Sequence, residues 1–187
     1  MGNINGFDHC LEGHSSQGSI TGLFGRDSRF LSRAELQIEG KAPIPLGLHT
    51  NNGYAMDVTA TNPFVEDKFN SDKIAVSRRV ALRGALLEEI TFQNFDHQSL
   101  AFDVTLSFAA DFRDLFEVRQ YANRQEWGTT QFLVTDLGFQ FRYEGLCRSQ
   151  MVSSIEFTHL YPHEVIHQTA LWHLELAPHE TIQLGYR

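Results

Sequence analysis

Cysteine is scarce in this sequence of 187 residues, which contains only Cys10 and Cys147. Two distant thiols are typical of a reduced cytoplasmic protein, with a single disulfide between them as the alternative. Long hydrophobic runs are also lacking, because no segment approaches the roughly 20 apolar residues that span a bilayer. Residues 1–18 have neither the basic start nor the apolar run of a secretory signal. The sequence therefore predicts a cytoplasmic protein without a membrane partner.

Lysine is the second scarcity, with only Lys41, Lys68 and Lys73 in the chain. The net charge is -8 at pH 7 and the pI is about 5.5. Phosphate binding needs clustered Lys and Arg, whereas the arginines here are scattered among acids. The glycine-containing segments 2–6 and 18–25 lack the Lys-Ser/Thr ending of a phosphate-binding loop. We therefore expect no nucleic-acid partner and no cofactor.

Phenylalanine, in contrast, is abundant at 15 copies, and a Phe-rich core suits β-strands. Runs in which every second residue is apolar place one face of a strand toward a core. The clearest run puts Leu100, Phe102, Val104, Leu106 and Phe108 on one face. A helix would distribute these five side chains around its circumference, so the run predicts a strand.

The same alternation recurs along the chain and predicts ten or so strands. The other predicted strands cover 33–39, 54–60, 74–82, 87–93, 139–143, 151–158, 172–176 and 182–184. In the strand at 54–60, Tyr54 is expected to share the inner face with Met56, Val58 and Ala60. The turn-forming residues at 94–97 predict that the strands on either side of them form a hairpin.

Only residues 109–121 favour a helix, and only briefly, because their apolar side chains are one to four residues apart. The sequence therefore predicts an all-β fold, a large antiparallel β-sandwich (supersandwich-like) with at most one short helical turn near 109–121. The length predicts one domain, which we place at 18–187. We expect residues 1–17 to be an N-terminal extension that is poorly ordered or loosely packed.

Two ordered blocks carry a family resemblance. The first joins GLFGRDSRFLSR at residues 22–33 to ELQIEGKAPIPL at residues 35–46, and the second joins LLEEITFQNF at residues 86–95 to FAADFRDLFEVR at residues 108–119. The chain resembles, over roughly residues 18–120, the N-terminal domain of bacterial-type glycogen debranching enzymes, which are amylo-α-1,6-glucosidase-like proteins. The closing LELAPHETIQL at residues 174–184 fits the family's last strands more loosely.

The resemblance implies a β-sandwich module that precedes a helical (α/α)6 catalytic barrel acting on α-glucans of the glycogen or starch class. The sequence stops at Arg187, where that barrel would begin. The resemblance therefore also implies that the catalytic residues of such an enzyme lie outside this chain. A fragment and a stand-alone relative are both open at this point.

Three acids at intervals of three, Asp111, Asp114 and Glu117, are the best catalytic candidates in the chain. Glycoside hydrolysis uses two carboxyl groups roughly 5 Å or 6.5 to 9.5 Å apart. A short turn would leave these acids solvated and ionised, and hence poor proton donors. We therefore predict no catalytic residue here, and expect the acids to bond local amides or to pair with Arg113 and Arg119.

A second polar segment, Arg26, Asp27 and Arg29, follows Gly25. In one interpretation Asp27 caps a turn and the arginines pair with nearby acids. In the other, the segment contacts a neighbouring domain or a glucan, because polar loops between strands are natural docking elements. The sequence leaves both open. The candidates for interdomain or glucan contact are Arg26, Asp27, Arg29, Asp111, Asp114, Glu117, Arg119 and Trp127.

Four aromatic residues could stack on sugar rings: Tyr54, Tyr121, Trp127 and Trp172. Trp172 alternates inward with its apolar neighbours, which predicts a core position. Trp127 lies in a polar stretch and is the better candidate for carbohydrate or partner contact.

Nine histidines raise the question of a metal site, and His159, His163 and His167 fall at intervals of four. Pro162 argues against a continuous helix there, so the three imidazoles need not converge. We expect no metal site.

The leading hypothesis is a non-catalytic accessory domain of an α-glucan-debranching glycoside hydrolase, which packs against and borders the active site of an (α/α)6 barrel. The alternative is a stand-alone carbohydrate-binding or protein-interaction module, since unrelated β-sandwiches share the same pattern. The expected partners are that barrel, with an α-glucan and self-association as further options.

Overall fold

The computed structural model describes residues 22–51, 53–119, 128–146 and 148–187. These residues form strands and one short helix. The elements are β1 Leu23–Gly25, β2 Ser28–Leu31, β3 Arg33–Ile38, β4 Ile44–Asn51, β5 Ala55–Thr61, β6 Ile74–Leu82, β7 Leu86–Asn94, β8 Leu100–Ala109, α2 Leu115–Val118, β9 Gly128–Thr135, β10 Gly138–Gly145, β11 Gln150–His159, β12 Glu164–Ile166, β13 Thr169–Leu176 and β14 Thr181–Tyr186. The all-β prediction is confirmed, and α2 lies inside the segment predicted to hold a helical turn.

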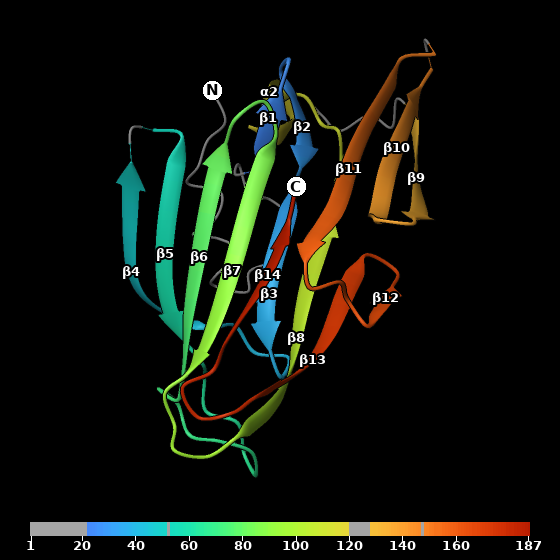
Figure 1. The fold of residues 1–187 in the computed structure, drawn as a ribbon. Helices are drawn as coiled ribbons and strands as arrows, with labels where there is room; N and C mark the ends of the chain where they lie inside the picture. Colours follow the sequence, from blue (N-terminus) through green and yellow to red (C-terminus); the bar gives the residue numbers. More distant parts are fainter. Residues whose placement is uncertain (1–21, 52, 120–127, 147) are drawn as a thin grey trace.

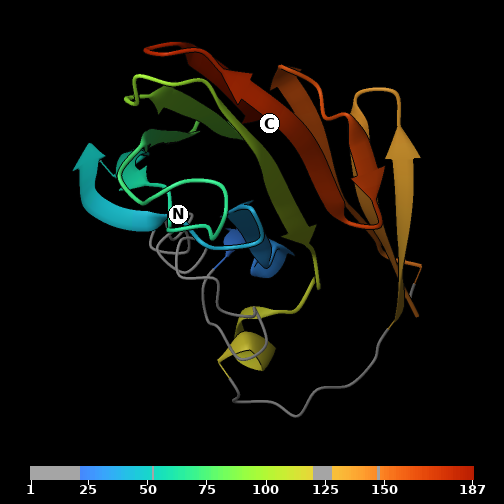
Figure 2. The ribbon, with the colours of Figure 1, turned by 90° about the horizontal axis from the view of Figure 1, so that it is seen from below.

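The strands form two facing antiparallel sheets and a separate hairpin (Figures 1 and 2). The large sheet has eight strands in the order β4-β5-β6-β7-β14-β11-β10-β9, and the small sheet has four in the order β12-β13-β8-β3. The hairpin is β1-β2. The fold is therefore a β-sandwich whose larger layer extends beyond the smaller one.

Aromatic side chains fill the space between the two sheets. Phe108 on β8 has its ring centroid 5.4 Å from that of Phe139 on β10 and 4.8 Å from that of Tyr186 on β14. Trp172 on β13 is fully buried, lies 5.4 Å from Phe157 on β11, and donates its indole N–H to the Leu160 carbonyl. Edge-to-face packing of this kind stabilises a core beyond the area that it buries. The predicted core position of Trp172 is confirmed.

The strand with the clearest alternation, β8, lies between β13 and β3. All five of its apolar residues from Leu100 to Phe108 are buried, as predicted. The same holds for Ala34, Leu36 and Ile38 on β3. Alternation thus identified the inner face of both strands, because only one face of each meets the core.

The predicted hairpin between the strands at 87–93 and 100–108 is wrong. β7 pairs with β6 and β14 in the large sheet, whereas β8 pairs with β3 and β13 in the small sheet. The chain therefore crosses from one layer to the other at this point. Buried Asn94 holds the corner, because its side-chain amide donates to the carbonyls of Gln98, Leu176 and Ala177.

Tyr54 is a second correction. The strand β5 begins one residue later, at Ala55, and the Tyr54 side chain is 54% exposed instead of sharing the inner face with Met56 and Val58. The backbone of Tyr54 still contributes, since its carbonyl accepts a hydrogen bond from the Leu82 amide. The prediction failed because alternation alone does not show where a strand starts.

Candidate functional site

The two polar segments singled out in the sequence meet at one end of the sandwich. β1 and β2 are joined by a two-residue turn in which Arg26 and Asp27 have φ of 48° and 64°. Such positive values match the tight turn that a two-stranded hairpin needs, although they are uncommon for residues other than glycine. Both side chains are exposed. The hairpin therefore presents a charged tip to solvent.

Backbone hydrogen bonds tie this hairpin to the segment before α2. The amide of Arg29 donates to the carbonyl of Arg113 at 2.8 Å, and the amide of Phe112 donates to the carbonyl of Arg29 at 3.1 Å. The Leu115 amide donates to the Asp27 carbonyl at 2.9 Å. These bonds join the hairpin and the α2 segment, which lie more than 80 residues apart in the sequence, into one unit.

An ion pair reinforces that unit. The Arg29 Nε donates to Asp111 Oδ1 at 3.0 Å, and its Nη2 donates to Asp111 Oδ2. The Arg29 side chain is 1% exposed and that of Asp111 is 25% exposed, while Arg113 lies 3.5 Å from the same carboxylate. A two-bond arginine–carboxylate contact fixes both the distance and the orientation of its partners. Asp111 therefore positions the hairpin.

Gly22 explains how Arg29 lies so close to the hairpin backbone. The glycine has φ of 145°, and a Cβ atom there would lie 2.4 Å from the Leu31 carbonyl oxygen and 2.6 Å from Arg29 Cδ. A larger residue at position 22 would therefore displace the arginine stem. The local sequence is compatible with this ion pair because residue 22 has no side chain.

The acids Asp114 and Glu117 form the cap of α2. Asp114 Oδ1 accepts from the Glu117 amide at 2.8 Å, and Glu117 Oε2 accepts from the Asp114 amide at 3.2 Å. This reciprocal pair is a capping box, which satisfies amides that a helix start leaves unpaired. Arg119 follows at the end of the helix and is exposed. Trp127, and with it Tyr121, lies outside the described residues.

The carboxyl end of the chain lies beside this hairpin (Figure 1). An apolar groove of about 220 Å³ separates them, and its walls come from β1, β2, the β6–β7 turn, β11 and the last two residues. The lining includes Leu23, Phe30, Leu86, Ile155 and Tyr186. The Ser153 hydroxyl donates to the Phe30 carbonyl and so joins β11 to the hairpin. This region consists of the hairpin tip at 26–27, α2, the groove and Arg187. We call it the carboxyl-end surface.

A buried ionic cluster that the sequence analysis missed lies on the inner face of the large sheet. Arg78 on β6 donates to Glu88 on β7, and the Tyr186 hydroxyl on β14 donates to the other oxygen of the same carboxylate. Arg78 and Glu88 are 1% and 0% exposed. Buried charges of this kind require partners, so the cluster fixes the last strand against its neighbours. The signal was present, because Arg78 and Glu88 both occupy inward positions of alternating strands.

The histidines at 159, 163 and 167 do not form a metal site. His163 instead lies beside His173, with ring centroids 5.4 Å apart, and His173 Nδ1 is 2.6 Å from Asp103 Oδ1. Within the described ranges, no group of three or more His, Cys, Asp or Glu side chains could hold a metal ion. His159 ends β11 and His163 precedes β12, so the interval of four does not correspond to the repeat of a helix.

Comparison with known families decides the relationship. A family model described as the N-terminal domain of some glycogen debranching enzymes matches residues 8–187. The chain belongs to this family. The match covers both blocks on which the resemblance was based and extends through the last strand. No curated protein matches the chain.

As an N-terminal domain of the glycogen debranching family, the chain is part of a larger multidomain architecture. Among the described residues, no helix is long and apolar enough to cross a membrane.

Proposed function

We propose that this chain is a non-catalytic accessory domain of an amylo-α-1,6-glucosidase-type debranching enzyme, and that its carboxyl-end surface packs against an (α/α)6 catalytic barrel. The observation that carries the proposal is the common location of three features: the charged hairpin tip, the α2 segment and Arg187. A catalytic domain joined to Arg187 by a short linker would begin within reach of all three. The proposal also places the enzyme in the cytoplasm, where thiols stay reduced.

The chemistry of the carboxyl-end surface supports docking. Its groove is lined mainly by apolar groups, and Val152 beside it is 45% exposed. Interfaces combine an apolar centre with a polar rim, and the hairpin and α2 segment of the same surface carry the exposed charges Arg26, Asp27 and Arg119. Arg26 and Asp27 also hold positive φ, a costly backbone geometry that clusters at functional sites. We expect the tip to order one edge of the substrate cleft after docking.

The acids at this end support a positioning role instead of catalysis. Asp111 binds Arg29 and Arg113, while Asp114 and Glu117 satisfy each other's amides. A glycosidase needs one carboxyl group kept protonated by its surroundings and a second one across a sugar-shaped cleft. These carboxylate oxygens are occupied by arginine and amide partners within the fold, so they are not free to flank a glycosidic bond.

The activity test uses the purified chain with a branched limit dextrin and measures reducing sugar. We expect no release above background. Turnover that is abolished by Asp111→Asn or Glu117→Gln would overturn the accessory-domain proposal and make the chain a small glycosidase.

The docking test measures binding of the chain to a separately purified catalytic domain from a debranching enzyme of this family by calorimetry. Val152→Asp at the groove should weaken binding on the order of tenfold or more, because a buried unpaired charge costs several kcal/mol. Ile166→Asp is the matched control, since Ile166 is 49% exposed on β12 outside the groove. Equal affinity for the wild type and both variants would contradict docking at this surface.

A second candidate function is glucan binding by the outer face of β9, β10 and β11. A groove of about 430 Å³ there is lined by Thr129, Gln131, Gln140, Arg142 and Glu144, among others, and Arg142 donates to Gln140 Oε1. Amide, guanidinium and carboxylate groups of this kind can bond sugar hydroxyls. Titration with maltooligosaccharides tests this function. Loss of affinity in Arg142→Ala would indicate a glucan site in this groove, and loss of affinity in Trp127→Ala would indicate a glucan site at Trp127. No binding at all would favour the purely accessory role.

A further inference from the structure

β9 is an edge strand with an open side. It is the last strand of the large sheet, and among the described residues it pairs only with β10. Figures 1 and 2 place it at the outer margin of the molecule. The β9–β10 register runs without a break from Thr135 opposite Gly138 to Gly128 opposite Gly145. A strand of this kind presents a row of backbone donors and acceptors that a further strand can use.

The sequence of β9 lacks the features that normally protect such an edge. Its eight residues, GTTQFLVT, contain no charge and no proline, and no bulge interrupts its pairing. The other edges are protected: β4 carries Pro45 and a register shift, β12 and β1 have only three residues each, β2 has only four, and β3 carries Arg33 and Glu35. Charges, prolines, bulges and short lengths are the usual means of blocking edge pairing. β9 is therefore the described edge most suited to accept another strand.

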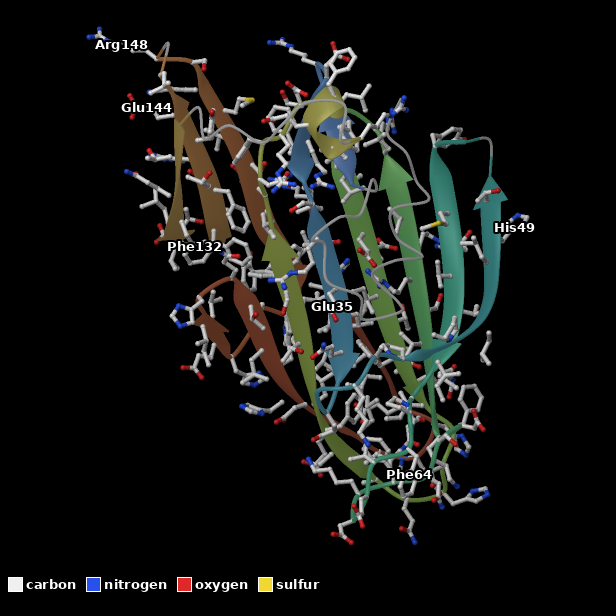
Figure 3. The ribbon with its side chains drawn as sticks, turned by 180° about the vertical axis from the view of Figure 1, so that it is seen from behind. Glu35, His49, Phe64, Phe132, Glu144 and Arg148 are labelled. Carbon is white, nitrogen blue, oxygen red and sulfur yellow. The ribbon has the colours of Figure 1, made fainter. Side chains whose placement is uncertain are left out.

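The inner face of β9 adds an apolar contribution. Phe132 is half-buried and its ring lies 5.2 Å from that of Phe139 and 5.7 Å from that of Phe141 (Figure 3). Val134, opposite Phe139 and on the same face, is 64% exposed. The small sheet thus leaves the last strand of the large sheet incompletely covered. A strand added beside β9 would continue the inner face and remove part of Val134 from water.

We propose that β9 binds antiparallel to β9 of a second copy of this chain, which joins two large sheets across a twofold axis. The charge pattern favours this occupant: the chain carries a net charge of -8, yet its β9 is neutral, so self-pairing places no like charges opposite each other. A strand paired with its own copy is also self-complementary, as a twofold interface requires.

Face matching limits the register to arrangements centred on one residue, and the proposed dimer is centred on Phe132. Residues directly opposite in an antiparallel pair point to the same face, so the twofold axis must pass through a residue and not between two residues. When the axis passes beside Phe132, this residue faces its own copy, and Thr130 faces Val134 of the second copy. On the outer face, Gln131 then lies opposite Leu133. This arrangement uses a lateral edge and leaves the carboxyl-end surface free, so it does not depend on the proposed docking.

The first measurement is the mass of the full chain by light scattering over a concentration series. We expect the mass to rise from 21.3 kDa toward twice that value. Two double variants then test the strand itself, T130K/V134K and T130E/V134E. Both positions are exposed, so the monomer should tolerate the changes. In the proposed register each variant places like charges opposite each other, which should weaken dimerisation on the order of a hundredfold.

Mixing the two double variants provides the decisive arm, because opposite charges then face each other across β9 and the dimer should return. Recovery in the mixture also shows that each variant is folded. Leu48→Lys is the matched control, since Leu48 is 48% exposed on the edge strand β4 and should leave the dimer unchanged. The proposal is overturned if the wild type remains monomeric at all concentrations, if the variants dimerise like the wild type, or if mixing restores nothing.

Discussion

The small sheet and the carboxyl-end surface are stabilised by different interactions. In the small sheet, β8 buries five apolar side chains against the aromatic residues of the large sheet. At the carboxyl-end surface, the hairpin is held by three backbone hydrogen bonds, a two-bond ion pair and a capping box. The stabilisation from burying apolar side chains is proportional to the area buried and tolerates small shifts of the atoms. Hydrogen bonds and ion pairs, in contrast, depend on the orientation of their partners. The first region therefore supplies stability, and the second supplies position.

The largest expected effect tests the apolar side of this comparison. Phe102→Ala should lower the free energy of unfolding by about 3 to 5 kcal/mol, because a ring that contacts Phe92 and Phe69 leaves a cavity. Denaturant unfolding measures the change. Phe95→Ala is the control, since Phe95 is 55% exposed and should change the same quantity by no more than about 0.5 kcal/mol. A loss under about 1 kcal/mol for Phe102→Ala would mean that the face assignment of β8 is wrong.

The next effect tests the polar side. Asp111→Ala should cost about 1 to 3 kcal/mol of unfolding free energy, because it removes a carboxylate from the buried Arg29 guanidinium. The exposed pair Arg79–Asp57 offers a matched control, and Asp57→Ala should cost less than about 1 kcal/mol. Equal losses for the two variants would show that the burial of Arg29 does not matter, and would remove the contrast between the two ion pairs.

A smaller effect is expected at the cap of α2. Asp114→Ala should cost roughly 1 kcal/mol and speed hydrogen exchange at the Glu117 amide, because that amide loses its acceptor. Asp114→Asn should keep the slow exchange, since asparagine caps helices about as well as aspartate. If the alanine and asparagine variants exchange at the same rate, the capping box does not hold this segment.

The smallest effect concerns a partly exposed ion pair at the crossover between the sheets. Hydrogen bonds from Lys73 and from the His97 amide lower the pKa of Asp96 below its usual value. Since the folded pKa lies below the unfolded one, the stabilisation is present above the ordinary pKa of about 3.9 and is lost as the pH falls through the folded value. In an NMR titration, Lys73→Gln should raise the Asp96 midpoint and Arg79→Gln should not. An unchanged midpoint in Lys73→Gln would exclude Lys73 as the cause.

The carboxyl-end surface was predictable only in its parts. Sequence reasoning selected Arg29 and Asp111 as candidates and left open whether Arg29 pairs with a nearby acid or contacts a neighbouring domain. For Asp111 it offered local amides or the neighbours Arg113 and Arg119 as partners. The structure adds Arg29 across 82 residues of sequence. Local spacing shows which charges are near each other in the sequence. The partner of a buried arginine depends instead on which distant segments the fold brings together. The apolar groove beside Arg187 was not predictable for the same reason, since five separate segments line it.

The sequence by itself determined the fold class and the inner faces of the most regular strands. Alternation identified the inner face of β3 and β8, the apolar spacing at 109–121 indicated the helical turn in which α2 lies, and two ordered blocks indicated the family. These properties are local, because side-chain period follows directly from strand geometry. Only the tertiary structure decided that β7 and β8 belong to different sheets, that Arg78, Glu88 and Tyr186 share one buried cluster, and that β9 is the last strand of the large sheet among the described residues. Each of these depends on which distant segments meet, and that choice rests on the packing of the whole sandwich.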